Sequence, residues 1–221
     1  MTNALETIRP LFDTGTLQSL GPERRPEAKS LIEIESDLNT AMATTGLTGE
    51  TASIVRSVAL LWHDHLDESH RVSQGIKSTD GSFVHGIMHR REPDYSNAKY
   101  WFNRVSSHPT FPEISNRAKE YLTGSSLAHL MEGDWDSFAM VDAVTAARIG
   151  SEEYNLLQQV QQTEFEVCLT DTGFIDLNDS ELCTEGYENS GDIDYKSCCE
   201  NLVCPGGIGE CPWIEEEGFG G

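Results

Sequence analysis

Two short stretches of the sequence place histidines and carboxylates at spacings that suit metal coordination. In each stretch three such residues stand at i, i+4 and i+7, which places them on one face of a helix. The six residues are His63, Asp67 and His70 in the first stretch and His85, His89 and Glu92 in the second. If the two helices pack against each other, both sets can point at a common centre, as in metal sites inside helical bundles.

Three interpretations of this pattern stay open. Neutral imidazole together with carboxylate suits a divalent metal such as zinc, iron or manganese. Without a metal, a histidine–aspartate pair could transfer protons, with Arg90 or Arg91 stabilising an anion. The six residues could also be polar helix faces joined by ordinary i,i+4 pairs.

Several well-defined catalytic motifs are absent. The sequence contains no Gly-x-x-x-x-Gly-Lys loop, no Gly-x-Ser-x-Gly elbow and no Gly-x-Gly-x-x-Gly fingerprint. ATP hydrolysis, serine hydrolysis and dinucleotide redox chemistry therefore lack support. The His-Glu-x-x-His and Glu-x-x-His patterns are also missing, which argues against zincin and di-iron carboxylate proteins.

The elements that must position these residues are expected to be α-helices. Val55, Val58, Ala59, Trp62 and Leu66 recur at three- and four-residue steps and predict one long third helix that ends near Gly75. No stretch shows the sustained alternation of apolar and polar residues that is typical of a β-strand. We therefore expect an all-α array of helical hairpins. The expected helices cover about 3–12, 26–46, 48–75, 82–91, 96–108 and 112–122, with two more between 125 and 167.

Residues 83–109 resemble one tetratricopeptide repeat. The residues that match its intervals are Gly86, Ala98, Phe102, Val105 and Pro109. The resemblance implies two antiparallel helices in close contact, with an aromatic side chain filling the groove between them. No second copy of the repeat stands at a 34-residue offset, so a generic helical hairpin explains the match nearly as well.

A longer string, from Trp62 through Phe102, resembles segments of an uncharacterised bacterial helical protein family. That family carries no activity that could be transferred to this chain.

The charge of the chain excludes some classes of partner. The 221 residues carry a formal charge of −22. This argues against an electrostatic nucleic-acid binder and against a polybasic membrane anchor. No apolar run approaches the roughly 20 residues of a membrane span, and the first residues lack a secretory signal. We therefore expect a cytoplasmic protein without nucleic-acid or membrane partners.

The chain divides into a helical domain, 1–167, and an acidic, cysteine- and glycine-rich tail, 168–221. From Glu164 onward it has fifteen acidic residues and one basic residue, Lys196, and all six cysteines lie at or after Cys168. Such a composition stays disordered unless it is cross-linked or bound. The cysteines could form disulfides or hold zinc. The tail as a whole could be a redox-active segment, a flexible extension without a defined activity, or the end of a precursor whose C-terminus is modified.

The leading functional hypothesis is a binding or scaffolding protein whose helical groove engages a protein partner or its own tail. The predicted contact surface consists of Arg90, Arg91, Lys99, Trp101 and Arg104. The alternatives are a metal-dependent enzyme that uses the six histidines and carboxylates, and a precursor with a modifiable tail. The sequence leaves open whether the protein is an enzyme.

Overall fold

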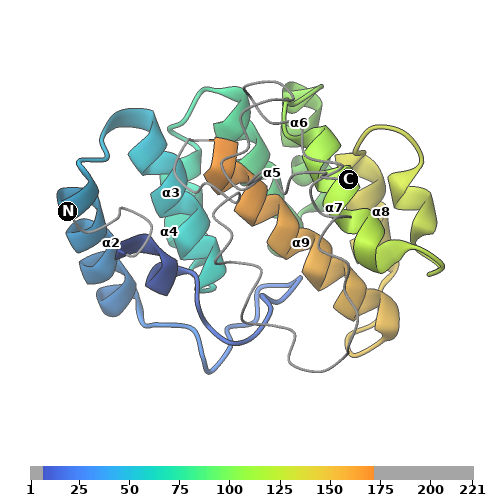
Figure 1. Ribbon diagram of the computed structural model, residues 1–221, viewed down its shortest axis with the longest axis horizontal. Helices are drawn as coiled ribbons and strands as arrows, with labels where there is room; N and C mark the ends of the chain where they lie inside the picture. The colour runs from blue at the N-terminus through green and yellow to red at the C-terminus, as the bar shows by residue number, and fades with distance from the viewer. Residues whose placement is uncertain (1–6, 172–221) are drawn as a thin grey trace, which may run out of the picture. The chain divides into compact units, whose positions relative to one another are not determined.

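Residues 7–171 are described by the computed structural model, and over these residues the chain forms α- and 3-10 helices with no strand (Figure 1). The predicted all-α class is thus confirmed for this part of the chain, which belongs to one compact unit. In chain order the elements are η1 (Arg9–Leu11), α2 (Leu31–Thr45), α3 (Gly49–Trp62), α4 (Leu66–Ser73), α5 (Thr79–Arg91), α6 (Tyr95–Val105), α7 (Phe111–Leu122), η2 (Ala128–Met131), α8 (Ser137–Ala146) and α9 (Glu152–Asp171).

Polar side chains fix where several of these helices begin. At the start of α2, the Ser30 hydroxyl accepts the N–H of Glu33, and the Glu33 carboxylate accepts the N–H of Ser30. At the start of α5, the Ser78 hydroxyl accepts the N–H of Gly81. Because of this cap α5 begins at Thr79, three residues before the start at residue 82 that the sequence pattern predicts.

The single long third helix predicted from the sequence is wrong, because the structure divides it. Helix α3 ends at Trp62 and α4 begins at Leu66. Between them Asp64 has a φ of 62°, in the left-handed region. Its two carboxylate oxygens accept hydrogen bonds from Arg25 at 2.8 Å and from Arg91 at 2.7 Å. These contacts stabilise the break between α3 and α4. The spacing of apolar residues cannot predict them, because they join segments that are far apart in the sequence.

Helix α5 lies at the centre of the packing. Every residue from Gly81 to Arg91 is buried, and the helix contacts α3, α4, α6 and α9. With α6 it forms a close helical hairpin, in which a Cβ added to Gly86 would lie 2.6 Å from a ring carbon of Phe102. Ala98 and Val105 are also buried on α6. This is the helix pair that the tetratricopeptide-like pattern predicts, and the resemblance to that family itself stays a prediction.

Helix α9, drawn in orange, crosses the middle of Figure 1, with α3 and α4 on one side of it and α7 and α8 on the other. It continues past residue 167, where the sequence suggested a domain boundary, to Asp171, and Cys168 is buried. None of the helices in residues 7–171 combines the length and apolar composition of a membrane span. The predictions for the other five cysteines and the rest of the tail lie outside the described residues.

Candidate metal centre

Three of the six predicted metal-binding residues come together in the structure. His70 on α4 and His85 and His89 on α5 each place one ring nitrogen so that all three nitrogens lie within 4.8 Å of one another. The ring centroids are 4.7 Å apart for His85 and His89, and 4.9 Å apart for His70 and either partner. We call this group the three-histidine cluster.

The cluster follows from the way α4 and α5 pack. His85 and His89 are one helical turn apart, so their rings share a face of α5 and stack with an interplanar angle of 16°. Helix α4 packs against α5 and brings His70 edge-on to both rings. The sequence pattern predicted all three residues as ligands. The i,i+4 spacing explains why His85 and His89 meet, and the packing of α4 against α5 brings His70 to them.

His85 is buried on α5 and has no hydrogen-bond partner within residues 7–171. Its residue is 2 % exposed, and neither ring nitrogen has a partner among the described residues. Burial, followed by the nearby charges of His89 and His70 when protonated, lowers the pKa of His85 to about 3. The ring is thus neutral at physiological pH, with a nitrogen lone pair that no donor in the described part of the chain uses.

His89 is buried as well, but it has partners. Its Nδ1 lies 3.0 Å from a carboxylate oxygen of Glu92, and its Nε2 lies 3.0 Å from the side-chain nitrogen of Asn97. Burial, and then the charge of His70, lower the pKa of His89, while the bond to Glu92 acts to raise it. Glu92, which the sequence predicted as a ligand, therefore holds the His89 ring from beside the cluster.

Helix α6 closes one side of the cluster. The Trp101 ring stacks on His85 at a centroid distance of 4.0 Å and an interplanar angle of 16°. The Arg104 guanidinium lies 5.2 Å from the centre of the Trp101 ring. Sequence reasoning missed Asn97 as a neighbour of the cluster, because its place at the start of α6 matters only once α5 and α6 form their hairpin. It had assigned Trp101 to a partner surface.

The other two predicted ligands lie outside the cluster. His63 is fully buried at the break after α3, where its Nδ1 accepts the N–H of Lys29 and its Nε2 bonds the carbonyl oxygen of Leu11. Asp67 is exposed in the first turn of α4. The break after α3 separates His63 from the helix that carries His70. Asp67 shares α4 with His70 but is exposed and does not join the cluster.

The predicted basic contact surface is wrong for Arg90 and Arg91, because both side chains are fully buried. Arg90 pairs with Glu164 of α9, and Arg91 pairs with Asp64. Burial of a charged side chain requires such pairing, and the partners are too far along the chain to show in the local sequence.

The remaining residues of that predicted surface keep some exposure. Lys99 is half-buried and pairs with Asp142 at 2.5 Å, Trp101 is half-buried, and Arg104 is exposed. Tyr100 beside them is 56 % exposed. These side chains leave a small aromatic and basic surface on α6.

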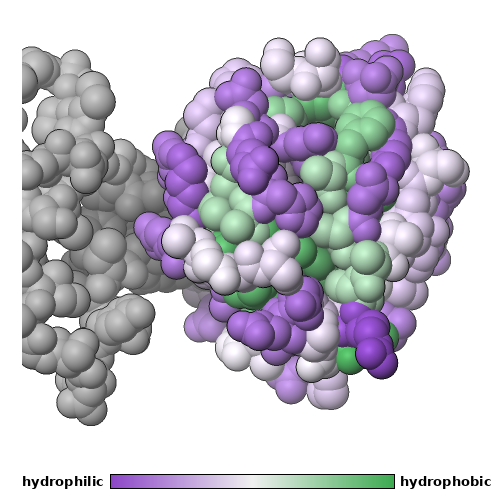
Figure 2. Space-filling model, turned by 90° about the vertical axis from the view of Figure 1, so that its right-hand side faces the viewer, coloured by the Kyte–Doolittle hydropathy of each residue, from purple (hydrophilic) through white to green (hydrophobic). Residues whose placement is uncertain are grey.

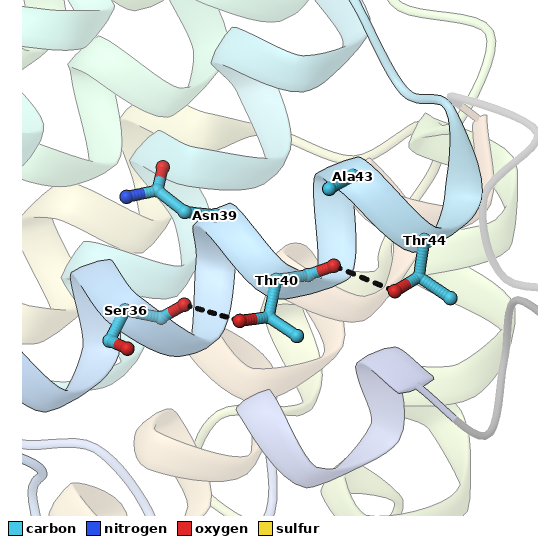
Figure 3. A pocket seen from close by; sticks show the side chains of 5 residues that line it. All are labelled: Ser36, Asn39, Thr40, Ala43 and Thr44. Carbon is cyan, nitrogen blue, oxygen red and sulfur yellow. Dashed lines mark hydrogen bonds between the residues drawn. The ribbon is translucent and has the colours of Figure 1, made fainter.

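Two surface pockets lie away from the three-histidine cluster and are lined by none of its residues. One lies along α2, where Thr40 and Thr44 turn their hydroxyls back to carbonyl oxygens of their own helix (Figure 3). The other is formed by η2, α8 and the start of α9, and is lined by alanines together with His129, Asp142 and Arg148. Apolar side chains between polar ones characterise the face that Figure 2 turns to the viewer, the side on which α8 lies in Figure 1.

Comparison of the chain with models of protein families, with curated proteins and with solved structures finds no match.

Proposed function

We propose that the protein binds a divalent transition-metal ion, zinc in the first place, through His70, His85 and His89. The observation that carries the proposal is the convergence of three ring nitrogens within 4.8 Å, one of them on a buried ring without a partner among the described residues. Most buried polar groups in proteins are hydrogen-bonded, and one that is not calls for an explanation such as a bound ion.

The distances fit a metal after small movements. Zinc binds imidazole nitrogen at about 2.0–2.1 Å, so tetrahedral donors lie about 3.3 Å apart. The nitrogens of the three-histidine cluster lie at most 4.8 Å apart. Rotation of side chains, which brings these atoms closer by at most about 1.5 Å, completes the geometry. His70 is only partly buried and is the ring best able to rotate.

The donor set selects among the metals that the sequence suggested. Imidazole suits zinc, copper, iron and nickel, whereas manganese prefers carboxylate oxygen. The cluster contains three imidazoles and no carboxylate among the described residues. Zinc and iron therefore remain good candidates, and manganese becomes the weakest.

Glu92 and Asn97 would have different parts in binding. A histidine that ligates a metal usually donates its other N–H to a carboxylate or carbonyl, which fixes the ring. Glu92 already lies at Nδ1 of His89, in the place of such a carboxylate. We propose that the metal takes Nε2 of His89 and displaces the neutral amide of Asn97, which is only partly buried.

Zinc titration of the full chain tests the proposal. We expect wild type to bind one equivalent of zinc more than the His85→Leu variant, because leucine keeps the volume and removes the ligand. At zinc concentrations of about 100 times the dissociation constant, that site should add about 2.7 kcal/mol to the free energy of unfolding. Tail cysteines and other histidines can bind zinc too, so the difference between variants is the informative quantity.

A matched control comes from His129, an exposed histidine on η2 outside the cluster. His129→Ala should bind as much zinc as wild type. Equal binding by wild type and His85→Leu would contradict the proposal.

The binding or scaffolding function expected from the sequence remains a prediction. Its support is now limited to Lys99, Trp101 and Arg104 on α6, because Arg90 and Arg91 are buried. The precursor hypothesis concerns the tail and lies outside the described residues.

A further inference from the structure

We infer that the metal keeps a fourth coordination position facing solvent, and that this position takes a small anion such as azide, cyanate or a carbonate-sized oxyanion. This inference rests on the proposed function and deepens it. The metal in the three-histidine cluster could then hold and polarise a ligand that comes from solution.

The number of protein ligands supports an open position. Structural zinc sites have four protein ligands, whereas catalytic sites have three and leave one position for water or substrate. Among the described residues, no cysteine, aspartate or glutamate joins the three nitrogens of the cluster. Glu92 is bonded to His89 instead and serves to orient that ring.

The charge of the ligand set favours an anion. A histidine ligates a metal as neutral imidazole, so none of the three ligands of the cluster brings a negative charge. Three neutral imidazoles leave the full double positive charge on the metal, and a partly buried cation attracts an anion strongly. Water in that position loses a proton near pH 7 for the same reason, so hydroxide is the natural competitor.

Access to the cluster is one-sided. Trp101 covers His85, and α5 is buried along the length that carries the ligands. His70 is partly exposed, and the Glu92 side chain is 44 % exposed, so solvent reaches the cluster from the side of these two residues.

The side chains around the cluster favour a small ligand. The Trp101 ring stacks directly on His85, and every residue of α5 from Gly81 to Arg91 is buried. These crowded surroundings favour a small inorganic anion over an organic substrate.

Cobalt substitution of the full chain tests the inference, because the visible spectrum of Co²⁺ reports its ligands. Sodium azide added to the cobalt-loaded protein should change the visible bands saturably at pH 6.5. The apparent affinity should fall about tenfold for each pH unit above the pKa of the bound water, as hydroxide replaces azide. His129→Ala should respond as wild type does.

The experiment distinguishes a failure of the proposed metal binding from a failure of the open coordination position. If wild type binds no more cobalt than His85→Leu, the proposed function fails. If wild type binds the extra cobalt but azide leaves its spectrum unchanged, the metal site stands and the open position is refuted. An intense near-ultraviolet sulfur-to-cobalt band, present in wild type and lost in His85→Leu, would also refute it, because a cysteine would then fill the fourth position.

Discussion

At the scale of single residues, two buried histidines of this protein have opposite hydrogen-bonding states. His63 uses both ring nitrogens to bind the backbone of Lys29 and Leu11. His85 uses neither within the described residues. A buried polar group without a partner costs about 1–3 kcal/mol of stability. His85 therefore destabilises the folded protein unless a ligand binds one of its ring nitrogens.

Replacement of His85 by leucine should therefore stabilise the metal-free protein. We expect His85→Leu to raise the free energy of unfolding by about 1 kcal/mol, since the desolvation penalty is removed and part of the stacking on Trp101 is lost. Urea denaturation in the presence of a chelator measures this change. The comparison is His63→Leu, which should cost about 2 kcal/mol because Lys29 N–H and Leu11 C=O lose their partner. A loss of stability in His85→Leu similar to that in His63→Leu would contradict this account.

His63 should also make the stability depend on pH. Burial lowers its pKa in the folded protein below the ordinary value of 6.5. Below about pH 6.5 the unfolded chain therefore binds a proton that the folded chain does not, and stability falls as pH falls, by at most about 1.4 kcal/mol per pH unit. Above that pH this contribution is constant.

Glutamine at position 63 offers an acceptor and a donor but does not titrate. Urea denaturation of chelated wild type and His63→Gln at pH 7.5, 6.5 and 5.5 should show the wild type losing more stability at low pH. The other titrating groups are common to both proteins and cancel in the difference. Parallel curves would show that His63 does not carry this dependence.

At the scale of elements, the hairpin of α5 and α6 positions the cluster and its cover. The two helices approach closely at Gly86, where the ring of Phe102 occupies the space that a side chain would need. The same hairpin brings Trp101 onto His85 and Asn97 onto His89. A change in the spacing of these helices should therefore disturb the site as well as the fold.

Gly86→Ala tests this coupling. We expect a loss of about 1–3 kcal/mol, because the added methyl group overpacks the contact with Phe102, together with weaker zinc binding. Gly75→Ala is the control, since a Cβ there meets only ordinary contact with the Val72 carbonyl oxygen, at 3.4 Å. Thermal denaturation and zinc titration of both variants measure the two effects. Unchanged stability in Gly86→Ala would show that the helices can separate freely.

The sequence predicted those features that depend on local pattern. Hydrophobic periodicity gave the helical class, and i,i+4 spacing gave His85 and His89. The break after Trp62 could not be predicted, because it depends on Asp64 binding arginines from two other segments. For the same reason the sequence could not show that His63 and His70 do not share one helix face.

At the scale of the whole molecule, buried ion pairs connect segments that are distant in sequence. Arg90 on α5 bonds Glu164 on α9, and both side chains are fully buried. Local reasoning placed Arg90 on the surface, since a charged side chain is rarely buried. Its partner stands 74 residues away, so the pairing becomes visible only in the folded chain.

The pair should show strong non-additivity. Glu164→Leu should cost about 3–5 kcal/mol, because it leaves the Arg90 charge buried and uncompensated. The double variant Arg90→Met with Glu164→Leu should lie closer to wild type, since it removes both charges and keeps an apolar core. Urea denaturation of the single and double variants closes the cycle. Additive losses would mean that the two residues do not act as a pair.

The central claim is that one metal ion sits among His70, His85 and His89. The most direct measurement is a crystal structure of the zinc-loaded full chain, with anomalous difference maps recorded on both sides of the zinc absorption edge. We predict a single strong peak in the three-histidine cluster, at about 2.0–2.1 Å from one nitrogen of each ring. Zinc bound elsewhere, with no anomalous peak between these three rings, would contradict the account.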